Sequence, residues 1–360
     1  MDTVLVTGGA GFIGSCFIRH LLAGTSARVV DLDALTYAGN LANLRDLPDP
    51  GRHTFVHGDI TNRKLVDDLL HRWEIDTIVH FAAESHVDRS IWGPMAFVQT
   101  NVVGTAILLE AARNAWLTDK ILPVEKVRFH HVSTDEVFGD LGPDDPPFSE
   151  TTPYAPNSPY AATKAASDHI VRAYGHTYGL PVTICNCSNN YGPRQHPEKL
   201  IPFMILAALE GRSLPIYGDG RNVRDWLYVE DHCAAIQAVL DRGLPGETYN
   251  VGGGTGQTNL ELVRLLCSIL DELLPGAAYV PHAKLMQFVG DRPGHDRRYA
   301  MDVGKIQREL GWTFRETLRS GLTKTVQWYL ANPEWAASVR GQPVYQEWLA
   351  QNYVDRGASA

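Results

Sequence analysis

Tyr160 and Lys164 have the residue types and the spacing of a base and its electrostatic helper. The segment Tyr160-Ala-Ala-Thr-Lys164 falls in a helical pattern, and residues four positions apart share one helix face. A tyrosine with an unperturbed pKa of about 10 is a poor base at neutral pH, and a neighbouring ammonium group lowers that pKa by favouring the phenolate. We therefore predict a tyrosine base at residue 160. The alternative is a surface helix that has this spacing by chance.

The segment Ser133-Thr134-Asp135-Glu136 offers a second kind of chemistry, because it ends in two adjacent carboxylates. Neighbours in a regular strand point to opposite faces, but past the end of a strand they need not. Two carboxylates in one partly desolvated site can hold different protonation states, so that one acts as an acid and the other as a base. The alternative is that both residues cap a loop or the next helix.

The elements that must position these residues predict a doubly wound α/β fold. In the first half of the chain, β-branched runs alternate with longer helical patterns, which is typical of βαβ units and a parallel, Rossmann-type sheet. The helical patterns are long enough to serve as crossovers. We expect strands at 3–7, 27–32, 54–57, 76–81, 127–133 and 181–186, and helices at about 12–23, 62–73, 94–116 and 158–178.

A glycine motif follows the first expected strand directly and predicts a dinucleotide site. Gly8, Gly11 and Gly14 recur at a spacing of three residues where the first helix opens. This spacing lets the backbone turn tightly and approach a pyrophosphate, whose charge sits on the helix N-terminus. Ordinary loop glycines are the alternative, and the strand-turn-helix context argues against it.

Acidic residues at the ends of the next two strands complete this cofactor site. An acidic residue about 20 positions after the motif binds the adenosine ribose in such folds, and Asp33 has that position. Asp31 is the alternative, since the two share a strand face. A carboxylate there repels a 2′-phosphate, so NAD is preferred over NADP. Asp59 and Ile60 are placed to flank the adenine, and capping of the next helix is the alternative for Asp59.

The second half of the chain predicts a smaller lobe. After Asn189 the sequence breaks into short segments rich in Gly and Pro, and a mixed α/β lobe there would close a cleft over the cofactor. We divide the chain approximately into an NAD-binding domain at 1–188 and a substrate-binding lobe at 189–360, with interdigitation of the lobes allowed. The tail from residue 331 carries Trp335 and Trp348, and we expect it to pack on the body.

Composition excludes several classes of protein. With Lys+Arg 32 against Asp+Glu 41 in 360 residues, the formal charge is −9, which disfavours a nucleic-acid binder. The sequence has no uncharged apolar run of 18 residues and no signal-peptide pattern, so we expect a cytoplasmic protein that does not bind a membrane. The five cysteines contain no Cys-x-x-Cys pair, so we expect reduced thiols and no metal site.

Taken together, the motifs resemble a known family. The glycine motif, Tyr160 and Lys164 resemble those of the extended short-chain dehydrogenase/reductases, and the Thr134-Asp135-Glu136 triplet resembles the dTDP-glucose 4,6-dehydratase family within them. The resemblance covers almost the whole chain. The other segments that carry it are 33–40, 80–90, 189–193, 198–202, 224–226 and 292–295.

The resemblance implies an NAD-dependent hydro-lyase that makes dTDP-4-keto-6-deoxyglucose from dTDP-glucose for deoxysugar biosynthesis. In the family's chemistry, Tyr160 removes the glucosyl C4 hydroxyl proton while the C4 hydride passes to NAD. Glu136 takes the C5 proton, Asp135 protonates the departing C6 hydroxyl, and the hydride returns to C6. Thr134 is implied to hydrogen-bond the sugar O4, and Lys164 to bind the nicotinamide ribose and lower the pKa of Tyr160. The reaction is redox-neutral, so NAD is implied to be tightly retained.

The resemblance also implies binding residues. The implied cofactor contacts are Gly8, Gly11, Phe12, Ile13, Gly14, Asp33, Leu35, Thr36, Asp59, Ile60, Phe81, Ala82, Ala83, Ser85, Thr100, Tyr160, Lys164 and Asn190. The implied substrate contacts are Ser85, Thr134, Asn189, Lys199, Leu200, Pro215, Ile216, Tyr217, Arg224, Asn259, Arg292, His295 and Tyr299. Arg224 is implied to neutralise the substrate pyrophosphate through its planar guanidinium group, and an ion pair with Asp219 or Asp225 is the alternative.

Other functions compete with this interpretation. A UDP-sugar 4,6-dehydratase or a 4-epimerase of the same superfamily would share Tyr160 and Lys164, and the Asp135-Glu136 pair disfavours the epimerase. From another class, a non-catalytic NAD-binding module would not need the Tyr, Lys and acid pair together. Thymidine and uridine nucleotides both stay open, because a methyl group gives only roughly 1–3 kcal/mol of discrimination.

The apolar residues of the two longest expected helices predict an interface with a second copy of the chain. These helices carry apolar side chains that need cover, among them Val102, Val103, Ile107 and Leu108 on the first and Ile170 and Val171 on the second. The family resemblance assigns these helices to a two-fold interface that forms a four-helix bundle. We therefore predict a homodimer.

Overall fold

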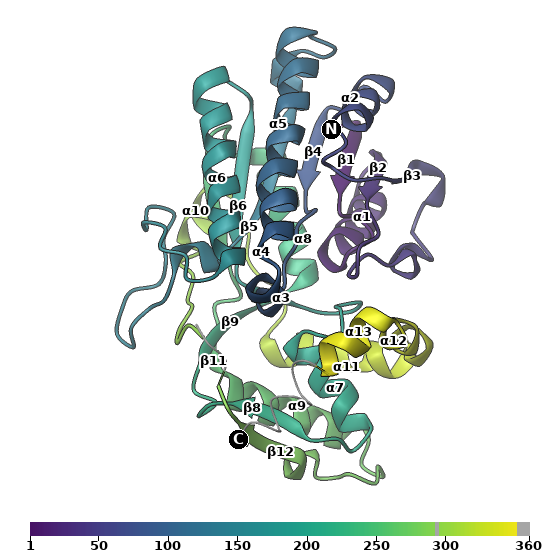
Figure 1. Ribbon diagram of the computed structural model, residues 1–360, viewed down its shortest axis with the longest axis vertical. Helices are drawn as coiled ribbons and strands as arrows, with labels where there is room; N and C mark the ends of the chain where they lie inside the picture. Colours follow the sequence, from purple (N-terminus) through teal and green to yellow (C-terminus); the bar gives the residue numbers. More distant parts are fainter. Residues whose placement is uncertain (292–294, 351–360) are drawn as a thin grey trace.

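The centre of the fold is a sheet of parallel strands. A computed structural model describes residues 1–291 and 295–350 and contains a seven-stranded sheet in the order β10-β6-β5-β4-β1-β2-β3 (Figure 1). Its strands are β1 (Thr3–Thr7), β2 (Arg28–Asp33), β3 (His53–His57), β4 (Thr77–His80), β5 (Arg128–Thr134), β6 (Val182–Cys187) and β10 (Thr248–Val251). The Rossmann-type fold is confirmed, and the six expected strands are present with ends shifted by at most one residue.

Helices cover both faces of this sheet, because alternate strand residues point to opposite sides. Val4 and Val6 of β1 pack in one core with α1 (Phe12–Gly24), α8 (Val229–Arg242) and α10 (Gly304–Leu310). Leu5, between them, packs on the other face with α2 (Arg63–Arg72), α5 (Thr105–Arg113) and α6 (Pro159–Tyr178). The sheet is therefore the middle layer of three, as the strand-helix alternation predicts.

The helix expected at 94–116 is a composite. It follows α3 (Val87–Trp92) and runs through α4 (Pro94–Phe97), a π-helical segment (Val98–Gly104), α5 and a second π-helical segment (Asn114–Thr118). Among the described residues, this 25-residue helix, Pro94–Thr118, is the one that is long and apolar enough to cross a membrane by composition. It contacts α2 and α6 and buries the polar Asn101 and Thr105, which identifies it as a covering helix of the sheet.

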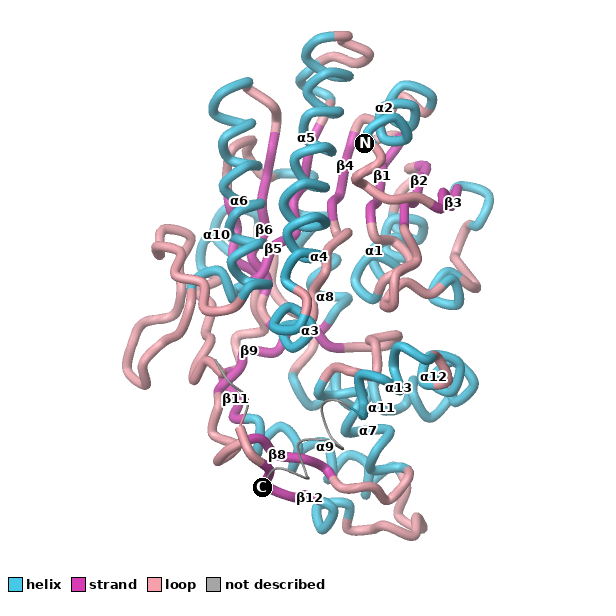
Figure 2. Tube along the Cα trace, in the orientation of Figure 1, coloured by secondary structure: helices cyan, strands magenta, loops and turns pink. Residues whose placement is uncertain are grey.

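The second lobe lies at one end of the large sheet (Figure 2). Its strands are β7 (Asn189–Tyr191), β9 (Val223–Tyr228) and β11 (Gly256–Thr258), which form a mixed sheet, and the parallel pair β8 (Leu214–Tyr217) and β12 (Met286–Val289). Its helices are α7 (Leu200–Leu209), α9 (Asn259–Leu273), α11 (Leu318–Ala331), α12 (Pro333–Arg340) and α13 (Pro343–Leu349). Short 3₁₀ helices occupy Leu41–Leu44, Pro50–Arg52, Val124–Lys126, Asp135–Phe138 and His282–Leu285.

The chain passes between the two lobes more than once. α8, β10 and α10 come from the second half of the sequence but pack with the large sheet, where β10 pairs with β6. The lobes therefore interdigitate, and a single division at residue 188 does not separate them. A strand as short as β10 gives a weak periodic signal, which is why the pattern of the sequence did not assign it to the first lobe.

The turn from β1 into α1 is closely packed, and two glycines of α1 test this packing. A Cβ atom at Gly14 would lie 2.2 Å from the carbonyl oxygen of Gly8, whereas a Cβ at Gly24 would meet nothing within 4 Å. We predict that Gly14→Ala lowers the free energy of unfolding by about 1–3 kcal/mol through overpacking. Gly24→Ala should leave it unchanged or raise it by about 0.4–1 kcal/mol. Urea denaturation of both variants measures this, and equal midpoints would contradict the packing described.

Candidate active site

A cavity of about 310 Å³ opens where the carboxyl ends of the parallel strands meet the second lobe. Its lining includes Gly8 after β1, Asp33 at the end of β2, Phe81 after β4 and Thr134 at the end of β5. Ligands of open α/β sheets bind at this edge of the sheet. The cavity therefore lies where the fold predicts a site, and both lobes contribute to its wall.

The glycine motif forms a cradle at one side of the cavity. Gly8 has a φ of +75°, and a Cβ there would lie 2.8 Å from the backbone nitrogen of Ala82. Gly11 is the N-cap of α1, and no side chain caps this helix end. The N–H groups of the first turn are thus open to an anion, as a pyrophosphate requires. This part of the cavity fits the predicted dinucleotide.

The structure separates the roles of Asp31 and Asp33. Asp31 is fully buried, accepts a hydrogen bond from the Gly9 N–H (3.1 Å) and does not line the cavity. Asp33 lines the cavity and accepts hydrogen bonds from the N–H groups of Ala10 (2.9 Å) and Leu35 (2.7 Å). A carboxylate has further lone pairs, so Asp33 can still accept from ribose hydroxyls. Asp33 is therefore the residue placed to bind the ribose, and Asp31 supports the glycine turn.

Most of the other expected cofactor residues line the same cavity. They are Gly11, Phe12, Ile13, Gly14, Thr36, Asp59, Ile60, Phe81, Ala82, Ala83, Ser85, Thr100 and Asn190. Leu35 does not line it; this residue has a positive φ (51°) and orients Asp33 through its backbone. Asp59 does not cap α2, because Asn62 does, and it instead accepts hydrogen bonds from the N–H and hydroxyl of Thr61.

Tyr160 and Lys164 come to the cavity from the start of α6. Ser158 caps this helix by accepting a hydrogen bond from the Ala161 N–H, so Tyr160 lies in the first turn and Lys164 one turn later. Both side chains are buried, and both line the cavity. Lys164 Nζ donates a hydrogen bond to the carbonyl oxygen of Val132 (2.9 Å), which ties α6 to the end of β5.

The Thr134-Asp135-Glu136 triplet faces these residues from the end of β5. All three line the cavity, and Asp135 and Glu136 open a 3₁₀ turn rather than continue the strand. The Thr134 hydroxyl donates to Asp135 Oδ1 (3.2 Å) and accepts from the Glu136 N–H (3.3 Å). The end of the strand therefore lets two neighbouring carboxylates reach one cavity, as the sequence predicts.

The electrostatics of this triplet favour a protonated Asp135. Burial, and then the carboxylates of Glu136 and Asp225, raise the pKa of Asp135 well above its ordinary value, against the lowering effect of the Arg224 charge. Its Oδ2 atom is buried without a hydrogen-bond partner in the part of the chain that the structure describes. A neutral carboxyl group with an unused oxygen is suited to donate a proton to a bound ligand.

The predicted lowering of the Tyr160 pKa depends on a bound nicotinamide cation as well as on Lys164, and the chain without its cofactor shows the opposite shift. Burial is the largest effect and raises the pKa of Tyr160 well above its ordinary value, and the Glu136 carboxylate raises it further. Lys164 is instead turned toward Val132 and the ring of His131. The spacing of the two residues predicts a shared helix face, but it contains no information on how far burial raises the pKa of the phenol.

The expected substrate residues fall into two groups. Ser85, Asn189 and Lys199 line the cavity with the catalytic candidates, and Lys199 Nζ donates to the Ser85 carbonyl oxygen (3.1 Å). Asn189 Oδ1 is buried without a partner among the described residues, so a ligand hydroxyl could bind it. Leu200, Pro215, Ile216, Tyr217, Arg224, Asn259, His295 and Tyr299 belong to the second lobe outside this cavity lining, and Arg292 lies outside the described residues.

Arg224 is buried in the second lobe. Its guanidinium group donates to the carbonyl oxygens of Val223 and Asp296 (both 2.8 Å) and lies 4.3 Å from the ring centre of Tyr299. The two acids named as alternative partners have other contacts, since Asp219 pairs with Arg297 (2.9 Å) and Asp225 accepts the Gly253 and Thr255 N–H groups. Arg224 is thus held by backbone carbonyls, close enough to Asp135 to lower its pKa.

The cavity has a wall that the sequence did not predict. Trp335 and Val339 of α12 and the following Gln342 line it, together with Asn43, Arg194 and His196. Trp335 Nε1 donates to Asn43 Oδ1 (2.8 Å), and Asn43 Nδ2 donates to the Ala10 carbonyl oxygen in the glycine turn (2.9 Å). The C-terminal helices therefore touch the cofactor side of the cavity. The expectation that the tail packs on the body is confirmed for residues 331–350, whereas Tyr353 lies outside the described residues; no local signal identified the position of the tail.

Comparison with known proteins places these features in a family. A family model described as GDP-mannose 4,6 dehydratase matches residues 5–325. A dTDP-glucose 4,6-dehydratase from Shigella flexneri is 53% identical over 361 residues, which cover 98% of this chain and 99% of that protein.

Solved structures give the same result. A dTDP-glucose 4,6-dehydratase from Streptomyces venezuelae, with NAD and a dTDP ligand bound, has a TM-score of 0.84 and 49% identity, and the match covers 94% of this chain and 99% of that one. A UDP-glucose 4-epimerase from Thermotoga maritima, with UDP-glucose, has a TM-score of 0.80 and 27% identity, covering 92% and 99%. Proteins of much lower sequence identity, such as this epimerase, thus have the same fold.

The two acids at the end of β2 test the cofactor site. We predict that Asp33→Asn weakens NAD binding about tenfold or more, because a hydrogen bond to a charged group contributes about 1.5–3 kcal/mol. The variant should also bind NADP relatively better, since the charge that repels a 2′-phosphate is gone. Asp31→Asn is the control and should change NAD affinity less, because residue 31 does not line the cavity and the Asn oxygen can still accept the hydrogen bond from the Gly9 N–H. Calorimetric titration of cofactor-free protein measures both. A larger loss in the Asp31 variant would reverse the assignment.

Proposed function

The chain belongs to the dTDP-glucose 4,6-dehydratase family, and from that premise we propose that it converts dTDP-glucose to dTDP-4-keto-6-deoxyglucose and water. The observation that carries this proposal is the meeting of an acid pair with a Tyr and Lys pair in one cavity. An epimerase needs the Tyr and Lys but has no elimination to catalyse. The acid pair that lines the cavity therefore favours a dehydratase.

The first step is the oxidation of the sugar at C4. Tyr160 takes the proton of the C4 hydroxyl, which Thr134 orients through its own hydroxyl. Bound NAD would supply the hydride acceptor for C4 and the hydride donor for C6, and the residues of the glycine turn and Asp33 would hold it. Lys164, held at the end of β5 by Val132, supplies positive charge beside Tyr160 and hydroxyl-binding protons for the cofactor ribose.

Glu136 and Asp135 then each carry out one of the two proton transfers in the elimination of water. A 4-keto group acidifies the proton on C5, and Glu136 removes it as the base. Asp135, whose pKa is raised by burial and by neighbouring carboxylates, donates its proton to the C6 hydroxyl, which leaves as water. Addition of hydride at C6 and of a proton at C5 completes the product. Arg224 and Lys199 are the cations proposed to attract the substrate pyrophosphate.

The function is tested by the product. Incubation with dTDP-glucose should give a 4-keto-6-deoxy sugar, which develops an ultraviolet chromophore in base, with no added oxidant or reductant. UDP-glucose in a parallel reaction should be turned over more slowly. A C4 epimer without a chromophore would show a 4-epimerase, and faster turnover of UDP-glucose would show a UDP-sugar dehydratase.

Amide variants separate the two carboxylates. In D₂O the wild-type product should carry solvent deuterium at C5. Glu136→Gln cannot accept the C5 proton, so we predict little C5 exchange. Asp135→Asn keeps the base and should permit some C5 exchange, yet release water slowly, by roughly 10²–10⁴-fold. Mass spectrometry of recovered sugar measures both, with substrate affinity as the control. Wild-type exchange in the Glu136 variant, with none in the Asp135 variant, would reverse the two roles.

We also propose that the protein is a cytoplasmic homodimer. Large apolar side chains are exposed on α3, α4 and the segment that follows, among them Trp92 (70% exposed), Met95 (72%) and Val103 (37%). An exposed apolar patch of this kind supports an interface, here a four-helix bundle built from Pro94–Thr118 and α6 of two copies.

The dimer proposal predicts a solution mass near twice 39.8 kDa. Met95→Glu should weaken the dimer, because it places a charge in the apolar interface. Leu244→Glu is the matched control, since Leu244 is similarly exposed (63%) but follows α8, away from these helices. Light scattering against concentration measures the mass. A wild-type mass near that of one chain, or dissociation caused equally by both variants, would contradict the interface.

A further inference from the structure

Behind the catalytic Lys164, a buried carboxylate on the same helix has no role in the steps described above. Asp168 follows Lys164 by four residues, so Tyr160, Lys164 and Asp168 lie at successive turns on one face of α6. Asp168 has no solvent-exposed surface. An isolated buried carboxylate is costly, so its partners decide what it does.

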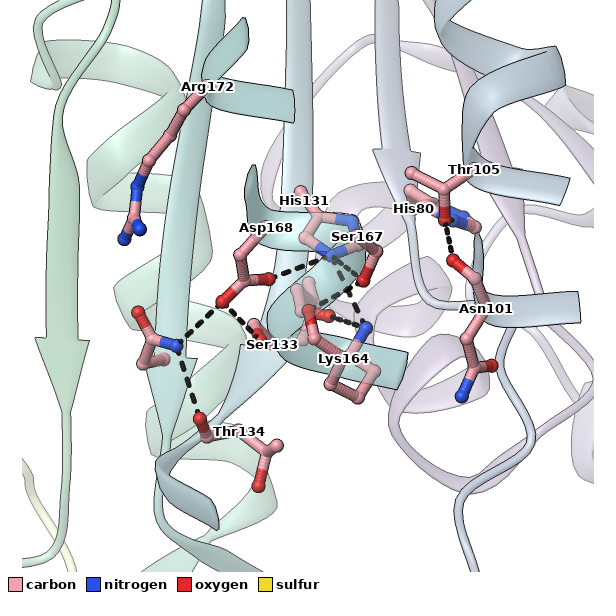
Figure 3. A network of polar contacts seen from close by, with 12 residues as sticks. His80, Asn101, Thr105, His131, Ser133, Thr134, Lys164, Ser167, Asp168 and Arg172 are labelled. Atoms are coloured by element: carbon pink, nitrogen blue, oxygen red, sulfur yellow. Dashed lines mark hydrogen bonds and ion pairs between the residues drawn. The ribbon is translucent and has the colours of Figure 1, made fainter. Parts of the chain in front are cut away.

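Asp168 is held from several elements at once. Its Oδ2 atom accepts hydrogen bonds from Ser133 Oγ of β5 (2.9 Å), Tyr154 OH of the preceding loop (2.8 Å) and Asn186 Nδ2 of β6 (3.2 Å). Asn186 Nδ2 also donates to the carbonyl oxygen of Thr134 (3.1 Å), so the same network reaches the catalytic triplet. Figure 3 shows Asp168 beside Ser133, with dashed lines to Ser133 and to His131.

The other carboxylate oxygen points toward His131, whose ring also lies next to Lys164. Asp168 Oδ1 lies 3.2 Å from Nε2 of His131, and the same nitrogen lies 3.4 Å from Lys164 Nζ (Figure 3). The imidazole of His131 thus bridges the ammonium and the carboxylate. One ring nitrogen cannot donate to the carboxylate and accept from the ammonium at the same time. The ring nitrogen can therefore pair with only one of the two groups at a time, and it lies between them.

The pKa directions agree with this geometry. Burial would raise the pKa of Asp168, but the hydrogen bond and charge of His131 and the Lys164 charge bring it below its ordinary value, so the group stays ionised. Burial lowers the pKa of Lys164, and the Asp168 carboxylate is the largest effect in the opposite direction. Without Asp168, burial would favour the neutral amine.

Titratable groups that face this pair from the neighbouring elements carry little charge at neutral pH. Burial lowers the pKa of His131 of β5 to about 4 and that of His80 of β4 well below its usual range. Burial raises the pKa of Cys185 of β6 to about 12, and those of Cys187 and of Tyr154 also rise. Arg172, one turn further along α6, donates to Tyr154 OH (2.8 Å). Asp168 is thus the anion that faces Lys164.

We propose that Asp168 is a positioning residue for the reaction, the buried counter-ion that keeps Lys164 protonated at the end of β5. This inference rests on the proposed function, because it assigns Asp168 a part through Lys164 and not through contact with the substrate. Ser133, Tyr154 and Asn186 hold the carboxylate in place, and His131 sets its separation from the ammonium group.

The pH dependence of kcat/KM tests the proposal. In Asp168→Asn the counter-ion is gone, so the pKa of Lys164 falls and the alkaline limb of the profile should move to lower pH by about 1–3 units, the usual effect of a nearby opposite charge. Asp231→Asn is the matched control, because Asp231 is also a buried carboxylate held by N–H groups, those of Arg315 and Glu316 (both 3.0 Å), but on α8. Its alkaline limb should not move. A rate that falls by one factor at every pH in Asp168→Asn would contradict the proposal.

Thermal unfolding tests the same pairing without activity. With NAD in excess, the melting temperatures of Lys164→Met, Asp168→Asn and the double variant are compared. If the two charges are partners, the loss in the double variant is smaller than the two single losses added together. Losses that simply add would contradict the pairing, even if the protein turned out to act on a different sugar. Should Asp168→Asn alone fail to fold, a folded double variant supports the proposal and an unfolded one contradicts it.

Discussion

Lys164 has to keep its charge while its side chain is buried between α6 and the end of β5, and the arrangement of the site depends on this. Its hydrogen bond to the Val132 carbonyl joins the helix to the strand. That join sets the distance between the Tyr160 side of the cavity and the Thr134-Asp135-Glu136 side. A neutral amine could be buried more cheaply, but it would not stabilise a phenolate. The hydrogen-bond network around Asp168 holds a negative charge near Lys164 and so offsets the cost of burying the ammonium group.

At the same end of β5, two buried carboxyl groups have pKa values that are shifted in opposite directions. Asp168 has three hydrogen-bond donors on one oxygen and remains ionised, whereas Asp135 has the Thr134 hydroxyl and two carboxylate neighbours, so its pKa rises. Two buried carboxylates, both beside β5, thereby hold different protonation states. The difference comes from their donors and neighbours, since both are fully buried. The oxidation uses the positive charge of Lys164 and the elimination uses an available proton on Asp135, and the site supplies both from neighbouring positions.

How far the sequence predicts this protein depends on whether a signal is local. The strands, the glycine turn and the Tyr160–Lys164 face follow from spacings of a few residues, and the structure agrees with them. Asp31 and Asp33 could not be separated by spacing, because residues two apart share a strand face; the cavity separates them. The contact of Trp335 with Asn43 joins residues 292 positions apart, so no local pattern predicts it. Burial, which raises the pKa of Tyr160 in the chain without its cofactor, is likewise a property of the whole fold.

The central claim is that one cavity oxidises C4, eliminates water and reduces C6 of the same sugar molecule. A single-turnover reaction with an equal mixture of dTDP-glucose carrying deuterium at C4 and dTDP-glucose carrying ¹³C throughout the sugar measures this directly. Mass spectrometry should find the deuterium at C6 only in sugars without ¹³C, because the hydride returns to the molecule that supplied it. Deuterium at C6 of ¹³C-labelled product, or its loss to the solvent, would contradict the claim.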